Sequence, residues 1–132
     1  MTREPLEIWV NPACSKCRAA TAALDAAGID YVERRYLVDP PTAAELEDVL
    51  GRLRLEPWDL ARAAEARAAG IEVPRDAEHR TAWIEAMVAH PEVIQRPIIT
   101  TADGTSVVAR DEGTLADVVD ASRSPRRPPQ SR

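Results

Sequence analysis

The sequence of 132 residues contains no phenylalanine, one lysine, two histidines and two cysteines. No segment approaches the roughly 18 consecutive apolar residues of a membrane-spanning helix, and the first residues lack the apolar core of a signal peptide. We therefore expect a soluble, cytoplasmic protein. The net charge of −5 gives no indication of nucleic-acid binding. The length is sufficient for one domain, with a core built mainly from alanine, valine and leucine.

The two cysteines, Cys14 and Cys17, follow the alternating apolar segment 6–10, where a short strand should lead into a helix. A thiol at the N-terminus of a helix faces unpaired backbone N–H groups and the positive end of the helix dipole, which favour the thiolate. The same N–H groups are suited to binding a tetrahedral anion. The segment therefore predicts a nucleophilic cysteine, a second thiol within its reach and an oxyanion site.

A C-x-x-C motif is typical of redox-active thiols but also of one half of a zinc site. Zinc would need two further ligands, and the only histidines, His79 and His90, lie 11 positions apart, instead of the roughly three to five of a zinc finger. Because the motif follows a strand and opens a helix, redox chemistry is favoured over zinc, over an inert buried pair and over a structural disulfide.

Periodicity and turn residues predict the order of the elements. Strands are expected at 6–10, 31–36, 97–101 and 106–109, and helices at 14–27, from a capping box at 42–45 to 53, at 57–69, at 77–89 and at 112–121. This order predicts an α/β, thioredoxin-like fold: a four-stranded mixed sheet in a domain of residues 1–121, with a helical insertion at about 42–90. The arginine- and proline-rich segment 122–132 is expected to be a disordered basic tail.

Four stretches of the chain resemble the ArsC/Spx family of thioredoxin-fold proteins, which includes the glutaredoxin-linked arsenate reductases. They are Asn11-Pro12-Ala13-Cys14, Tyr36-Leu37-Val38-Asp39-Pro40-Pro41-Thr42 followed by Glu45-Leu46, His90-Pro91, and Arg96-Pro97-Ile98-Ile99. In that family the loop cysteine attacks arsenate and three arginines hold the oxyanion. The resemblance therefore implies Cys14 as the catalytic nucleophile and Arg62, Arg96 and Arg110 as substrate-binding residues.

The resemblance also implies a structural role for Pro97, because thioredoxin-like folds place a cis-proline beside the active cysteine. Cis X-Pro bonds are uncommon, at about 5–6% of such bonds in folded proteins, so this one would be a feature of the site. Arginine suits a tetrahedral oxyanion better than lysine does, because its planar guanidinium can bind two oxygens at once.

Two positions depart from the pattern of the reductases. Val10 stands where they commonly have a histidine that helps to ionise the cysteine, and Cys17 stands where they carry a hydroxyl residue. Cys17 can supply the resolving thiol that those enzymes take from glutathione, which would leave a Cys14–Cys17 disulfide. The C-x-x-C motif also resembles the Spx-type branch, whose members sense thiol oxidation and bind RNA polymerase.

Three interpretations are therefore open: reduction of arsenate, of a similar oxyanion or of a disulfide; a redox-sensing regulator; or another function within the same family. For the first, the resemblance implies a small oxyanion substrate and, as electron donor, thioredoxin or glutathione with glutaredoxin. No bound cofactor, metal, DNA or membrane contact is expected, and the protein should be a monomer.

The ionisation of Cys14 has to come from the helix N-terminus and from cationic neighbours such as Arg96, Arg110 and Lys16. We expect its pKa to fall from ~8.5 to roughly 5.5–7.5, the range found at helix N-termini and in C-x-x-C motifs. Cys17, one helical turn further on, should be shielded and stay protonated until Cys14 has reacted.

Overall fold

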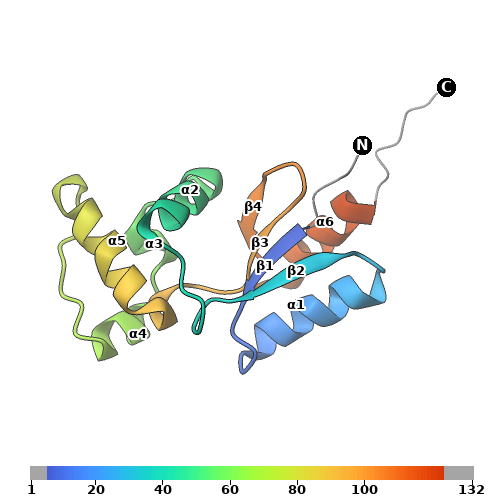
Figure 1. Ribbon diagram of the computed structural model, residues 1–132, viewed down its shortest axis with the longest axis horizontal. Helices are drawn as coiled ribbons and strands as arrows, with labels where there is room; N and C mark the ends of the chain where they lie inside the picture. The colour runs from blue at the N-terminus through green and yellow to red at the C-terminus, as the bar shows by residue number, and fades with distance from the viewer. Residues whose placement is uncertain (1–5, 124–132) are drawn as a thin grey trace. The chain divides into compact units, whose positions relative to one another are not determined.

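The computed structural model describes residues 6–123 (Figure 1). Residues 6–123 divide into two compact units, one made of 6–34 with 96–123 and one of Arg35–Gln95. We call them the sheet unit and the helical unit. The helical unit contains the predicted insertion. Within residues 6–123, no helix combines the length and the apolar character needed to cross a membrane.

The sheet unit begins with the predicted strand–helix–strand arrangement. β1 (Leu6–Val10) leads into α1 (Ser15–Ala26), which returns the chain to β2 (Tyr31–Arg35) beside β1. The two strands therefore run parallel (Figure 1). Gly28 has a φ of 71° and follows the end of α1, a conformation that glycine adopts without steric cost.

A β-hairpin of β3 (Ile98–Thr100) and β4 (Ser106–Val108) completes the sheet in the order β2-β1-β3-β4. β3 is antiparallel to both of its neighbours, with Ile99 opposite Ile8 and Val107. In the turn, Gly104 has a φ of 90° and donates its N–H to the carbonyl of Thr101 at 2.9 Å. The predicted four-stranded mixed sheet is thus confirmed.

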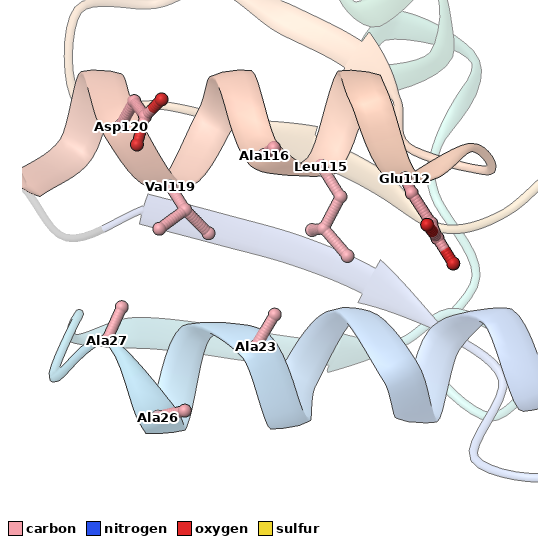
Figure 2. A pocket seen from close by; sticks show the side chains of 8 residues that line it. All are labelled: Ala23, Ala26, Ala27, Glu112, Leu115, Ala116, Val119 and Asp120. Carbon is pink, nitrogen blue, oxygen red and sulfur yellow. The ribbon is translucent and has the colours of Figure 1, made fainter.

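One face of the sheet is covered by α1 and by α6 (Glu112–Arg123), which pack side by side. The core between the helices and the sheet is made of small and medium apolar side chains, among them Ile8, Leu24, Ile99 and Val118. Where the two helices meet near the surface, alanines of α1 and both apolar and acidic side chains of α6 line a groove (Figure 2).

Residues 122 and 123 belong to α6, so this helix is two residues longer than the sequence predicted. These two residues were expected to be the start of the disordered tail. The rest of that segment, 124–132, lies outside the described residues.

The helical unit starts with α2 (Ala43–Leu53), whose predicted capping box is present. The backbone N–H of Glu45 donates to Thr42 Oγ1 at 3.1 Å, and the N–H of Thr42 donates to Glu45 Oε1 at 2.9 Å. These two bonds satisfy donors that the first turn of a helix leaves without partners.

The segment 57–69 is not the single helix that the sequence predicted. It forms α3 (Pro57–Leu60) and α4 (Ala63–Ala68), separated by two residues in extended conformation.

The helix breaks because its backbone pairs with a distant segment of the same unit. Ala61 forms an isolated antiparallel bridge with Ile94, and the N–H of Arg62 donates to the carbonyl of Val93 at 2.7 Å. Hydrogen bonds and buried contacts of this kind can outweigh the helix propensity of the segment, which amounts to a few tenths of a kcal/mol per residue. A local periodicity cannot reveal such a partner.

The predicted helix at 77–89 is observed as a 3₁₀ turn, η1 (Ala77–His79), followed by α5 (Arg80–Ala89). Trp83, Ile84 and Met87 are buried, as their helical spacing predicts. A second 3₁₀ turn, η2 (Pro91–Val93), follows α5.

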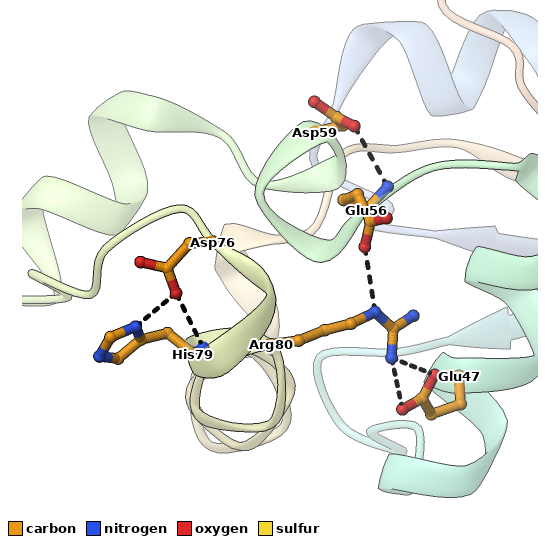
Figure 3. A network of polar contacts seen from close by, with 6 residues as sticks. All are labelled: Glu47, Glu56, Asp59, Asp76, His79 and Arg80. Carbon is orange, nitrogen blue, oxygen red and sulfur yellow. Dashed lines mark hydrogen bonds and ion pairs between the residues drawn. The ribbon is translucent and has the colours of Figure 1, made fainter.

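Arg80 connects three elements of the helical unit. Its guanidinium donates to both carboxylate oxygens of Glu47 on α2, at 2.7 and 2.8 Å, and to Glu56 before α3 at 3.0 Å (Figure 3). Because all three side chains are partly exposed, these pairs orient the helices more than they stabilise the unit.

Candidate active site

The loop between β1 and α1 is organised by Asn11. The side-chain oxygen of Asn11 accepts the N–H of Ala13 at 3.0 Å, and its backbone carbonyl accepts the N–H of Cys14 at 2.9 Å. These two bonds turn the chain so that Cys14 becomes the N-cap residue of α1, with extended φ and ψ of −87° and 127°. The thiol therefore lies at the N-terminus of the helix, as the sequence predicts.

Cys14 is the more acidic of the two thiols. Partial burial raises its pKa, but hydrogen bonds to the sulfur outweigh this effect and lower the pKa to about 7. The donors are the backbone N–H of Cys17, the side chain of Arg96, the backbone N–H of Lys16 and the thiol of Cys17. The protonated side chain makes no ordinary capping hydrogen bond, so these donors act on the thiolate. About half of Cys14 is then ionised at pH 7.

Lys16 acts on Cys14 through its backbone N–H, whereas the expected contribution was that of its ammonium group. The helix N-terminus and Arg96 thus stabilise the Cys14 thiolate without the help of a histidine at position 10. The resulting pKa lies in the range expected from the sequence.

Cys17 has the opposite environment. Its side chain is 1% exposed, within the core under α1, and burial raises its pKa to about 11. The backbone N–H of Asn11, 3.4 Å from Cys17 Sγ, lowers the pKa, and the negative charge on Cys14 raises it. Both cysteines are free thiols in the structure. The pair therefore consists of an ionisable, accessible thiol and a shielded, protonated one.

Two of the three predicted arginines lie in the sheet unit with Cys14. Arg96 precedes β3, its side chain hydrogen-bonds to Cys14, and the Arg96–Pro97 peptide bond is cis, as the resemblance implied. Arg110 follows β4, and its Nη1 donates to the backbone carbonyl of Arg96 at 3.2 Å. The hairpin thus brings the guanidinium of Arg110 to the backbone of Arg96, 14 residues earlier, whose own side chain contacts the reactive thiol.

Arg62 lies in the helical unit. It is the N-cap residue of α4, and its Nη2 is 3.3 Å from the carboxylate of Glu65. Its Nη1 is buried and has no hydrogen-bond partner among residues 6–123. The role of Arg62 in binding an oxyanion stays a prediction.

Each histidine has a carboxylate partner within the helical unit. His79 Nδ1 lies 2.6 Å from Asp76, and His90 Nδ1 lies 3.4 Å from Glu92. Asp76, Glu78 and His79 are the one cluster of potential metal ligands within the part of the chain described, and it contains no cysteine. Asp76 is already used there to cap η1.

Arg18 also contacts the active loop, although no motif in the sequence predicted it as a site residue. Its Nη1 donates to the carbonyl of Pro12 at 3.1 Å, which ties the first turn of α1 to the active loop. Its position four residues after Cys14 is the only signal in the sequence, since residues at this spacing share one face of a helix.

Comparisons with known proteins show the family of the chain. The model of the ArsC family matches residues 9–117 of the chain. An arsenate reductase of Neisseria meningitidis is 31% identical over 106 residues, which cover 80% of this chain and 90% of the reductase. A protein of Streptomyces viridochromogenes named "Uncharacterized protein in glnII region" is 53% identical over 117 residues, covering 86% of this chain and 98% of that protein.

The solved structure of an arsenate reductase from Vibrio cholerae matches with a TM-score of 0.77 and 27% identity, covering 89% of this chain and 99% of that one. The described architecture is accordingly thioredoxin-like. The segment matched by the family model includes the Asn-Pro-x-Cys loop, the cis-proline and all three arginines. The chain belongs to the ArsC family.

Proposed function

We propose that the protein is an arsenate reductase-like thiol oxidoreductase in which Cys14 is the nucleophile. The observation that carries this proposal is the position of Cys14 at the N-terminus of α1 in contact with Arg96, which lowers its pKa to about 7. A thiolate is the reactive form of cysteine, and the donors that stabilise it can also stabilise negative charge on a bound oxyanion. Arg96 and Arg110, with Arg62 as the family pattern implies, would bind that oxyanion.

In the first step, the Cys14 thiolate attacks arsenic(V). A sulfur–arsenic bond forms, one arsenic–oxygen bond breaks, and the oxygen leaves as water after it has been protonated. The cationic guanidinium groups and the N–H groups at the start of α1 neutralise charge on the remaining oxygens.

In the second step, Cys17 loses its proton and attacks Sγ of Cys14. The S–S bond forms, the sulfur–arsenic bond breaks, and its electron pair goes to arsenic, which leaves as arsenite. Two thiols are oxidised to one disulfide while arsenic gains two electrons. The negative charge on Cys14 raises the pKa of Cys17, and this charge disappears when Cys14 has bound arsenic. The first step therefore makes Cys17 easier to ionise.

The disulfide would then be reduced by thioredoxin, or by glutathione with glutaredoxin. The experiment that tests the proposal is arsenate turnover by the wild type and by Cys14→Ser and Cys17→Ser with each of the two donor systems. We expect no turnover for Cys14→Ser. We expect Cys17→Ser to lose turnover with thioredoxin and to retain part of it where glutathione can replace the missing thiol. Full activity of Cys14→Ser would contradict the assignment of the nucleophile.

A redox-sensing regulator is the second candidate, favoured by the direct contact between the partly exposed thiol of Cys14 and the buried thiol of Cys17. It predicts a reversible Cys14–Cys17 disulfide, little arsenate turnover, and binding of RNA polymerase in only one redox state. A pull-down with oxidised and with reduced protein distinguishes the two functions. Efficient arsenate reduction with no redox-dependent partner would exclude the regulator.

A further inference from the structure

We propose that the cationic side chains around Cys14 form a docking face for the acidic surface of a dithiol reductant protein of the thioredoxin class. The docking face consists of the exposed Lys16 and Arg18 on α1, together with two half-buried arginines: Arg96, which contacts the thiol, and Arg110, which contacts the backbone of Arg96. The inference rests on the proposed function in one respect: the reductant protein acts on the Cys14–Cys17 disulfide that this function generates.

The first argument is the distribution of charge. The chain as a whole carries a net charge of −5. Within the sheet unit, the segment from Ile8 to Leu24 contains no acidic residue, and its only charged side chains are Lys16 and Arg18. Both are exposed. An acidic protein on the whole thus presents positive charge where its reactive cysteine lies.

The second argument is geometric. The hydrogen bond from Arg18 Nη1 to the carbonyl of Pro12 holds this guanidinium against the active loop, two residues before Cys14. Arg96 contacts the Cys14 sulfur, and Arg110 donates to the carbonyl of Arg96. Hydrogen bonds, and not sequence proximity alone, therefore connect Arg18, Arg96 and Arg110 to the active loop and its thiol.

The neighbouring acidic residue does not cancel this charge. Asp111 follows Arg110, but its carboxylate accepts the backbone N–H of Thr114 at 2.6 Å and the hydroxyl of Thr114 at 3.0 Å. It therefore points to the start of α6, where a negative charge is favourable.

The third argument is the accessibility of the two sulfurs. Cys17 is 1% exposed, so an incoming thiolate can attack only Cys14 Sγ. The partner's sulfur then forms a mixed disulfide with Cys14, the Cys14–Cys17 bond breaks, and Cys17 leaves and takes up a proton. A second thiol of the partner attacks the partner's own sulfur and releases Cys14 as the thiolate. Two adjacent thiols on one partner complete this exchange, and an anionic thiolate with an acidic surround is attracted by the docking face.

The test measures reduction of the disulfide directly, without arsenate. Full-length protein is oxidised with diamide, and its reduction by an acidic bacterial thioredoxin is followed through NADPH consumption by thioredoxin reductase. Reduction of the same sample by dithiothreitol, which is small and uncharged at pH 7, measures the intrinsic reactivity of the disulfide. The quantity compared is the thioredoxin rate constant divided by the dithiothreitol rate constant.

We expect this ratio to fall about two- to five-fold in each of Lys16→Gln and Arg18→Gln, and to fall for the wild type as the salt concentration rises. The matched control is Ala26→Glu, which changes the net charge by the same amount at the exposed far end of α1, about 15 Å along the helix. This control should keep the ratio of the wild type.

Equal ratios in the wild type and in both variants, an equal loss in Ala26→Glu, or insensitivity to salt would overturn the inference. So would a failure of diamide to form the disulfide or of thioredoxin to reduce it. Because no arsenate is present, these outcomes are independent of substrate: a protein that shows the charge effect but does not turn over arsenate refutes the proposed substrate and leaves the docking face intact.

Discussion

At the scale of single residues, the two cysteines differ in acidity because one lies at a helix end and the other in the core. The pKa of about 7 for Cys14 and of about 11 for Cys17 predict that iodoacetamide modifies Cys14 increasingly from pH 6 to 8, with half of the maximal rate near pH 7. Cys17 should react far more slowly over that range. Mass spectrometry of tryptic peptides reports both sites separately, and modification of Cys17 first would contradict the assignment.

Arg96 contributes to this acidity through its hydrogen bond to the Cys14 sulfur. In Arg96→Gln the thiolate loses a cationic donor, and we expect the midpoint of Cys14 alkylation to move upward by about one pH unit. Lys16→Gln is the matched control, because Lys16 acts through a backbone N–H that the substitution keeps. The same alkylation profile measures both, and equal shifts in the two variants would show that only the general positive charge matters.

At the scale of elements, the start of α2 depends on one local device. Thr42→Ala removes the side chain that accepts the N–H of Glu45, so we expect the free energy of unfolding to fall by about 1 kcal/mol. Urea titration followed by circular dichroism measures this change. Thr81→Ala, at an exposed position inside α5, is the control and should be neutral or slightly stabilising because alanine has the higher helix propensity. A loss no larger at Thr42 than at Thr81 would contradict the capping role.

The elements also differ in how they arise. β1 and the β3–β4 hairpin follow from alternation and an Asp-Gly turn, and α2 follows from its capping box, because each of these signals acts between residues close in the chain. The division of 57–69 into α3 and α4 does not follow from a local signal, because Ala61 and Arg62 pair with residues more than 30 positions away.

At the scale of the whole molecule, the position of the second thiol determines what oxidation does. In the wild type, diamide should form the Cys14–Cys17 disulfide and leave the protein monomeric. In Cys17→Ser the reactive Cys14 has no internal partner, so we expect disulfide-linked dimers on a non-reducing gel and in size-exclusion chromatography. Cys14→Ser should stay monomeric, because the remaining Cys17 is buried and protonated. Dimers of that variant would show that Cys17 is more accessible than its burial indicates.

The sequence by itself determined the order of the elements, the family and the placement of Cys14 at the start of a helix, because periodicity, caps and a short active loop are local properties. The resemblance also named Arg96 and Arg110, but tertiary structure alone decided how these side chains contact the site. Arg96 and Arg110 meet only because a hairpin folds between them, and Arg18 contacts Pro12 only because the loop turns back on α1. The difference between the two thiols was also decided by packing, since the burial that raises the pKa of Cys17 comes from strands and helices distant in the chain.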